Sequence, residues 1–121
     1  MIRCGIDLLD IARMEELLGK RRFLERVFGP QELEQLKRRG MPAQSAAGNF
    51  AAKEAFLKLF ERGLFSVPLR EIEVLRRESG APYYRLSGSA ADLAENVEIA
   101  LSITHTDTQA AAFAVATGEG F

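Results

Sequence analysis

Cysteine pairs are missing from this sequence, because Cys4 is the only cysteine among 121 residues. A disulfide framework needs paired cysteines and a structural zinc site needs a cluster of ligands, so we expect neither. Long apolar runs are missing too. The stretch over residues 110–116 is far shorter than the roughly 20 residues that span a membrane. No basic and apolar leader opens the sequence, and we therefore predict a cytoplasmic protein without a membrane span.

A large net charge is also absent, since 16 basic residues face 17 acidic ones and the formal net charge is −1. Duplex nucleic acid is not expected as a partner, because its binding would depend on many phosphate contacts. The charge is unevenly spread: residues 13–39 hold eight basic and five acidic residues, while residues 89–121 hold five acids and no Lys or Arg. The basic run fits either an acidic protein partner or a solvated helix surface.

The length predicts a single domain over residues 1–121, large enough to bury about two-thirds of the surface of the unfolded chain. Apolar residues recur every three to four positions over residues 10–19, and residues 23–28 form a second short apolar face. Pro30 favours the start of a helix over residues 30–38, and residues that favour helices predict the longest helix over 43–62. Short apolar or alternating segments predict strands over residues 2–7, 72–74, 82–86, 97–103 and 110–116. Ser89 and Asp92 are expected to form a capping box for a short helix that ends near Asn96. The predicted class is α+β, with helices packed on a mostly antiparallel sheet.

Three polar residues stand where apolar or turn residues are usual: Asp7, Glu54 and His105. Asp7 closes an apolar strand, where it fits a turn or cap as well as a ligand. Glu54 lies four residues before Lys58, and the spacing equally suits an ion pair on a wet helix face. His105 follows an apolar strand and fits either a surface residue or a catalytic one. Composition and periodicity leave these alternatives open.

The same residues lie within three strings of a known family. The strings are Gly5-Ile6-Asp7, then Phe-Ala-Ala-Lys-Glu-Ala from Phe50, and Leu-Ser-Ile-Thr-His-Thr over residues 101–106. Weaker matches over residues 23–28 and 80–83 extend the similarity from about residue 2 to residue 115. In order and spacing the chain resembles the holo-acyl-carrier-protein synthases, which are small bacterial 4′-phosphopantetheinyl transferases.

The resemblance implies transfer of the 4′-phosphopantetheine group from coenzyme A to a serine of apo-acyl carrier protein in fatty acid biosynthesis, with release of adenosine 3′,5′-bisphosphate. It also implies Mg²⁺ as cofactor and a homotrimer with sites between subunits. Two carboxylates suffice for Mg²⁺, which keeps several waters and binds substrate phosphates. Small alanines over residues 110–116 and open sheet edges agree with close packing of a neighbouring subunit.

The resemblance assigns roles by position. Asp7 and Glu54 are expected to bind the metal. Glu54 and His105 are the candidate catalytic residues, and a metal-bound water is a competing base. The expected coenzyme A contacts are Lys58, Arg62, Gly63, His105 and Thr106. The expected contacts to the acidic carrier protein are Arg13, Lys20, Arg21 and Arg22, while Met14 and Leu17 beside them are expected mainly in the core.

Two departures from the family pattern stand out. Asn49 replaces an arginine, and Glu61-Arg62-Gly63 replaces Gly-Thr-Gly after the long helix. The first removes a guanidinium that would bind phosphate, and the second places a carboxylate near an anionic ligand. Arg62 is a candidate to compensate for the lost cation. The alternative to an active enzyme is therefore a weakened relative that binds carrier protein or a nucleotide without turnover.

Overall fold

The computed structural model describes residues 1–119 and 121. The elements in chain order are β1 (Ile2–Asp10), α1 (Ile11–Leu18), α2 (Arg21–Val27), α3 (Pro30–Arg38), α4 (Ala43–Leu59), a 3₁₀ turn η1 (Leu69–Glu71), β2 (Ile72–Arg76), β3 (Pro82–Leu86), α5 (Gly88–Leu93), β4 (Val97–His105) and β5 (Gln109–Gly118). This confirms the predicted α+β class. No helix among the described residues is both long enough and apolar enough to cross a bilayer.

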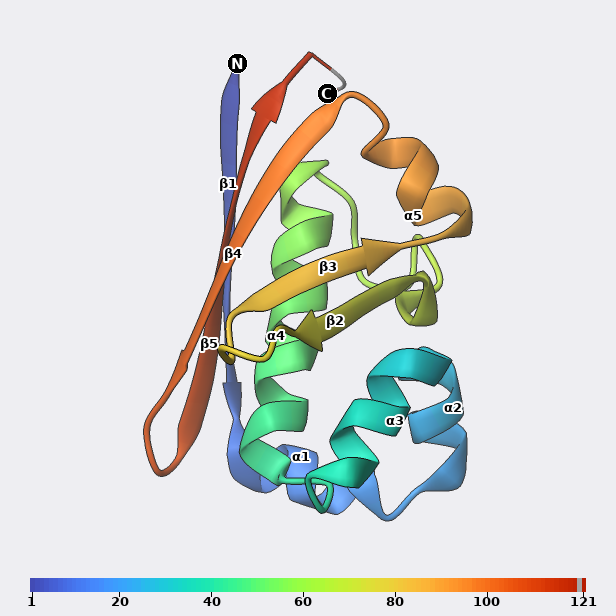
Figure 1. Cartoon of the computed structure of the whole chain (residues 1–121), viewed down its shortest axis with the longest axis vertical. Coiled ribbons are helices and arrows are strands. Elements are labelled where there is room, and N and C mark those ends of the chain that lie inside the picture. The colour runs from blue at the N-terminus through green and yellow to red at the C-terminus, as the bar shows by residue number, and fades with distance from the viewer. Residues whose placement is uncertain (120) are drawn as a thin grey trace.

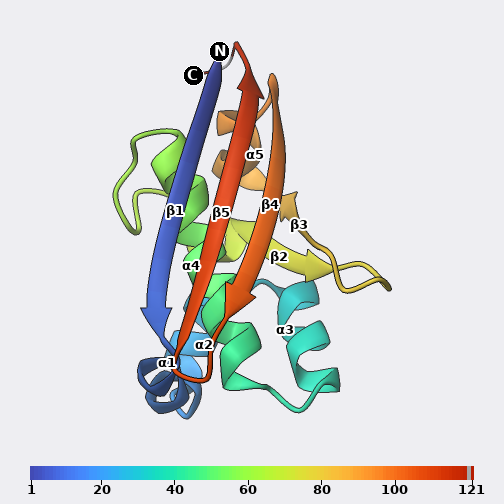
Figure 2. The same cartoon turned by 90° about the vertical axis from the view of Figure 1, so that its left-hand side faces the viewer.

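The main sheet is antiparallel, with strand order β1-β5-β4. Figures 1 and 2 show α4 lying along one face of this sheet, while the opposite face carries no helix. Strand β5 turns four alanines toward α4, and all four are buried: Ala110, Ala112, Ala114 and Ala116. Small side chains on the central strand allow the helix to approach the sheet closely.

Gly5 brings β1 nearest to α4. A Cβ atom built on Gly5 would lie 2.1 Å from the carbonyl oxygen of Ala55, so only glycine fits at this position. The two backbones therefore meet directly. Asp7 lies two residues further along β1, and Glu54 comes immediately before Ala55 on α4. The close approach at Gly5 thus brings the two predicted metal ligands near one another.

The hairpin of β2 and β3 packs across the other side of α4, and α1, α2 and α3 gather around the N-terminal end of that helix (Figure 1). Lys53 of α4 is fully buried there, and its Nζ donates to Glu32 Oε1 at 2.7 Å and to the carbonyls of Leu69 and Ile72. Burial raises the pKa of Glu32 and lowers that of Lys53. Removing one partner of such a pair leaves an uncompensated buried charge.

Several predicted boundaries were wrong. β1 does not end at Asp7 but continues to Asp10, because every residue from Ile2 to Asp10 pairs with β5. The capping box of Ser89 and Asp92 is not formed, since α5 begins at Gly88 and Ser89 Oγ instead donates to Glu71 Oε1 at 2.7 Å. Glu73 does not follow simple alternation with Ile72 and Val74: it is buried as they are, and it accepts a hydrogen bond from the backbone N–H of Glu32.

Helix α4 ends at Leu59, three residues before the predicted end. Glu61 has a φ of 55°, in the left-handed region. The N–H of Arg62 donates to the carbonyl of Leu57 at 2.9 Å, and the N–H of Glu61 donates to the carbonyl of Lys58 at 3.3 Å. This is the Schellman arrangement, which usually places glycine at the left-handed position. By the resemblance noted above, Glu61 stands where the first glycine of Gly-Thr-Gly is expected.

Candidate active site

A hollow of about 280 Å³ opens where β1 faces the second half of α4. Its lining residues are Asp7, Glu54, Leu57, Lys58, Arg62, Gly63 and Leu64. Asp7 pairs with Ala112 and so points to the face of the sheet that α4 covers. Glu54 and Lys58 lie one helical turn apart on α4 and share its face toward β1. The structure therefore brings together Asp7, Glu54, Lys58, Arg62 and Gly63.

Lys58 connects the helix to the strand. Its Nζ donates to the backbone carbonyl of Ile6 at 2.7 Å and to Asp7 Oδ1 at 3.3 Å. The Lys58 side chain is about half exposed, whereas that of Asp7 is 14% exposed. The predicted alternative was a simple ion pair between Glu54 and Lys58 on the helix surface. Among the described residues, the ammonium group of Lys58 is instead paired with Asp7 of β1.

The carboxyl groups of Glu54 and Asp7 lie side by side. Burial and the neighbouring Asp7 raise the pKa of Glu54 to about 7, and Lys58 only partly opposes the shift. Two adjacent carboxylates cannot both ionise without a compensating charge. A cation placed between them would remove the repulsion and favour both charged forms.

Asp7 Oδ2 supplies a separate indication that a ligand belongs here. This oxygen is buried, and no group of the described residues donates a hydrogen bond to it. Buried acceptors of this kind normally have a partner. Residues 1–119 and 121 contain no group of three or more His, Cys, Asp or Glu side chains that could hold a metal. Two carboxylates with room for water and phosphate oxygens nevertheless fit Mg²⁺.

The segment after α4 forms the cationic side of the hollow, through Arg62, Gly63 and Leu64. A Cβ built on Gly63 would meet no atom within 4 Å, so its backbone is open to the hollow. The position of Arg62 agrees with its predicted contact to an anionic ligand. The contact itself stays a prediction.

His105 and Thr106 do not join this hollow within the chain. Asp7 of β1 aligns through Ala112 with Ile103 of β4, so His105 lies two strands away and two residues further along. His105 is exposed, with Nδ1 3.1 Å from the carbonyl oxygen of Thr106. Thr106 Oγ1 accepts hydrogen bonds from the N–H groups of Thr108 and Gln109, which shape the turn before β5.

The predicted carrier-protein contacts are all exposed, on α1 and around the start of α2: Arg13, Lys20, Arg21 and Arg22. Arg21 also forms an ion pair with Glu25 at 3.0 Å. Met14 is fully buried and Leu17 packs against the core, as expected for both.

Asn49 lies in surroundings that its place in the sequence did not indicate. Asn49 does not face the hollow with Asp7 and Glu54; it is buried against β2, where its Nδ2 donates to the carbonyl of Val74 at 3.2 Å. Its Oδ1 accepts a hydrogen bond from Arg76 Nη2 at 2.9 Å. The signal available in the sequence was the pair Arg76-Arg77 at the end of the β2 segment, but only the fold brings Arg76 to α4.

The chain matches the family model described as "4'-phosphopantetheinyl transferase superfamily" over residues 3–116. It is 39% identical to the holo-[acyl-carrier-protein] synthase of Syntrophus aciditrophicus, covering 94% of each chain, and 39% identical to that of Treponema denticola, covering 94% of this chain and 96% of the relative.

Solved structures show the same similarity. The complex of such a synthase with coenzyme A from Chronobacterium ammoniagenes superposes with a TM-score of 0.86 at 32% identity, over 98% of each chain. The synthase from Neisseria meningitidis gives 0.87 at 28% identity, over 97% of this chain and 99% of that one. Each of these matches covers nearly the full length of this chain and of the protein compared with it. The chain is therefore a member of the holo-acyl-carrier-protein synthase family of 4′-phosphopantetheinyl transferases.

Proposed function

We propose that this protein transfers the 4′-phosphopantetheine group of coenzyme A to a serine of apo-acyl carrier protein, with Mg²⁺ as cofactor, in fatty acid biosynthesis. The bond formed joins the serine oxygen to phosphorus, and the bond broken releases adenosine 3′,5′-bisphosphate. The serine proton passes to a base. The proposal rests on the arrangement of the hollow. The carboxyl groups of Asp7 and Glu54 lie beside Lys58 and Arg62, and Asp7 Oδ2 accepts no hydrogen bond from the described residues.

Asp7 and Glu54 would hold Mg²⁺, which neutralises charge on the diphosphate oxygens when bound. Lys58 would contribute a second, flexible cation at the edge of the hollow. Its Nζ lies 3.3 Å from Asp7 Oδ1, and Lys58 lines the same hollow as the two carboxylates. Glu54 is also a candidate base, because its pKa of about 7 is close to neutral pH.

We also propose that the chain assembles as a homotrimer through the uncovered face of the main sheet. This face exposes large apolar side chains, with Ile2 73%, Ile6 61%, Leu8 58% and Phe113 42% exposed. Exposed apolar surface of this extent on a regular sheet favours a protein contact. His105 and Thr106 lie outside the hollow of their own chain, and in the assembly they would complete the hollow of an adjacent copy. Sedimentation of the wild type and of Ile6→Asp tests the assembly: a wild-type monomer would contradict it.

The carrier protein would bind along α1 and α2, where Arg13, Lys20, Arg21 and Arg22 present a cationic surface to an acidic partner. Charges at the rim of an interface mainly set the rate of encounter and its dependence on salt. Replacing Arg13 with Gln is expected to raise the KM for carrier protein more than it lowers kcat. An unchanged KM would place the docking surface elsewhere.

Mass spectrometry of apo-acyl carrier protein incubated with coenzyme A, Mg²⁺ and the protein tests the reaction. The expected result is a mass gain of one phosphopantetheine group, which is lost with a metal chelator and in Glu54→Gln. Glu95→Gln is the matched control, because Glu95 is exposed and far along the chain from the hollow. Equal turnover in both variants would overturn the metal assignment.

A second candidate is a binding module without turnover. It is favoured by Asn49 and Glu61, the two departures from the family pattern. In that case the wild type would retain binding of carrier protein or coenzyme A but show no mass gain. Assays with several apo-carrier proteins, and with Mn²⁺ in place of Mg²⁺, would define the acceptor and the metal.

A further inference from the structure

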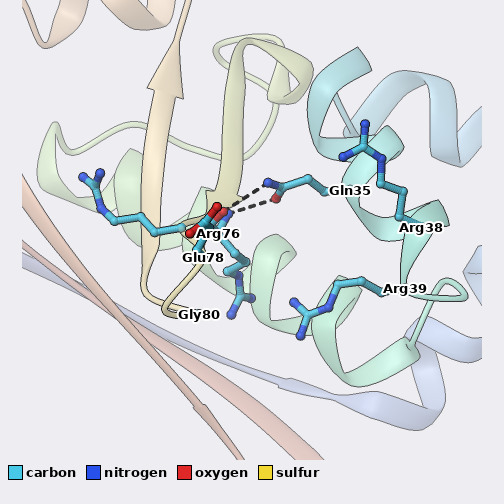
Figure 3. Close-up of a pocket in the computed structure, with 7 residues that line it drawn as sticks. Gln35, Arg38, Arg39, Arg76, Glu78 and Gly80 are labelled. Carbon is cyan, nitrogen blue, oxygen red and sulfur yellow. Dashed lines mark hydrogen bonds between the residues drawn. The ribbon is translucent and has the colours of Figure 1, made fainter.

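The two departures from the family pattern, Asn49 and Glu61, each have an arginine from another part of the fold as a partner. Asn49 Oδ1 accepts a hydrogen bond from Arg76 Nη2 at 2.9 Å. Gln35 holds the backbone of Arg76 through hydrogen bonds of 2.9 and 3.1 Å, beside the hollow between α3 and the β2–β3 turn (Figure 3). Asn49 is thus accounted for by contacts within the fold. Glu61 has its partner on β1.

Glu61 comes directly before Arg62 and Gly63, which line the hollow of the candidate active site, yet Glu61 is not itself a lining residue. Its side chain is 83% exposed, and its Oε2 lies 3.8 Å from Arg3 Nη1 near the start of β1. Glu61 forms no other ion pair among the residues that the structure describes. The carboxylate therefore lies toward β1 and not in the hollow.

Arg3 is held in place by groups other than Glu61. Its Nη1 donates to the carbonyl of Leu59, the last residue of α4, at 3.4 Å. Its guanidinium carbon lies 4.7 Å from the ring centre of Phe121. The ring of Phe121 packs in turn on Phe60, with 5.7 Å between the ring centres. Because the Arg3 side chain is only 29% exposed, its guanidinium is fixed at the end of α4 before any ligand binds.

The position of Arg3 suits two negative groups at once. Carbonyl groups at the C-terminal end of a helix carry partial negative charge, which a nearby cation stabilises. Helix α4 ends at Leu59, and the Glu61 carboxylate follows two residues later. A positive charge beside both groups reduces the repulsion that an anion in the adjacent hollow would meet from this end of the helix. The added carboxylate of Glu61 thus comes with a compensating cation from β1.

We propose that Arg3 is a positioning residue for coenzyme A: it holds the Glu61 carboxylate toward β1 and screens it from the diphosphate in the hollow. The identity of the ligand rests on the proposed function. Arg3 acts through Glu61 and does not touch the ligand itself. Since Glu61 is exposed and the pair is long, loss of Arg3 is expected to weaken binding only about threefold, in the range of exposed ion pairs.

Calorimetric titration with coenzyme A across a double-mutant cycle tests the proposal without any need for turnover. Arg3→Gln is expected to weaken binding about threefold in the wild-type background and to have no effect in the Glu61→Gln background. Glu61→Gln keeps the Cβ and the length of the side chain, so only the charge changes. Arg3→Lys keeps the positive charge and is expected to bind coenzyme A like the wild type. The weakening should also shrink at high salt, because salt screens exposed charges.

Arg70→Gln is the matched control. Arg70 is an exposed arginine without a carboxylate partner among the residues that the structure describes, and its loss is expected to leave coenzyme A binding unchanged. Equal weakening by Arg3→Gln in both backgrounds would overturn the proposal, because a purely structural role of Arg3 is indifferent to the charge at position 61. Wild-type affinity in Arg3→Gln would overturn it as well.

Inorganic pyrophosphate with Mg²⁺ is the second probe, because it carries a diphosphate charge without the rest of coenzyme A. If either ligand shows the cycle while no phosphopantetheine is transferred, the proposed function fails and the role of Arg3 stands. If the group is transferred but Arg3→Gln binds both ligands like the wild type, the role of Arg3 fails and the function stands. A wild type that binds neither ligand would overturn both.

Discussion

Replacing Glu61 with Gly is expected to stabilise the protein. Glu61 has a φ of 55°, in the left-handed position that ends α4. For a residue with a Cβ this conformation costs roughly 1–2 kcal/mol. Glycine avoids that cost but loses more backbone entropy on folding, by about 0.5–1 kcal/mol. The expected net gain is about 1 kcal/mol.

The contacts of the Glu61 side chain stabilise the fold too little to offset this gain. Its contact with Arg3 is long, at 3.8 Å, and the Glu61 side chain is 83% exposed. Exposed ion pairs of this kind contribute little to stability. With an unfolding entropy of about 2 cal/mol/K per residue, 1 kcal/mol corresponds to a Tm increase of about 4 °C for a domain of this size.

Thermal and urea unfolding of the wild type, Glu61→Gly and Glu61→Ala would measure the effect. Alanine removes the carboxylate but keeps the Cβ, so it is expected to bring no gain. If Glu61→Ala stabilises the protein as much as Glu61→Gly does, the cause is the charge and not the backbone, and the reasoning fails. Glu61→Gly is also expected to lower the KM for coenzyme A, because it removes a carboxylate beside the cationic edge of the hollow.

Three further predictions concern the region between α4 and its neighbours. The pKa of Glu54 is raised to about 7 in the folded protein, so the metal-free protein holds a proton that the unfolded chain releases above about pH 4.5. The Tm of the metal-free protein is therefore expected to fall between pH 5 and pH 7.5, less so in Glu54→Gln, and Mg²⁺ should reverse the fall; an equal fall in both proteins would contradict this assignment. Lys53→Met is expected to cost about 3–5 kcal/mol in urea unfolding, because it leaves Glu32 charged and buried, and adding Glu32→Gln should recover part of the loss. Gly5→Ala is expected to cost about 1–3 kcal/mol and most of the turnover, since the new Cβ forces β1 away from α4, whereas Gly19→Ala, whose Cβ meets no atom closer than 3.9 Å, should change neither.

The sequence determined the class of the fold because the patterns that it depends on are local. The 3.6-residue period of α1, the helix-favouring residues of α4 and the alternation in β4 require no knowledge of distant residues. The first two family strings likewise identified Asp7 and Glu54, with Lys58 one helical turn further on, and the structure brings all three to one hollow. His105 of the third string lies outside that hollow. Local rules located both ends of α3 and of β3, but not the end of α4. Helix α4 ends early because Glu61 takes a left-handed conformation that the identity of its side chain does not indicate.

Tertiary structure decided which polar residues are neighbours. Burial of Glu32 and Lys53 joins residues 21 positions apart, and contact between Asn49 and Arg76 joins residues 27 positions apart. No local pattern encodes such pairings, because they arise from how α3 and β2 pack on α4. The same holds for the contact of Arg3 with Leu59, 56 positions further along the chain, which forms only after β1 has packed along α4.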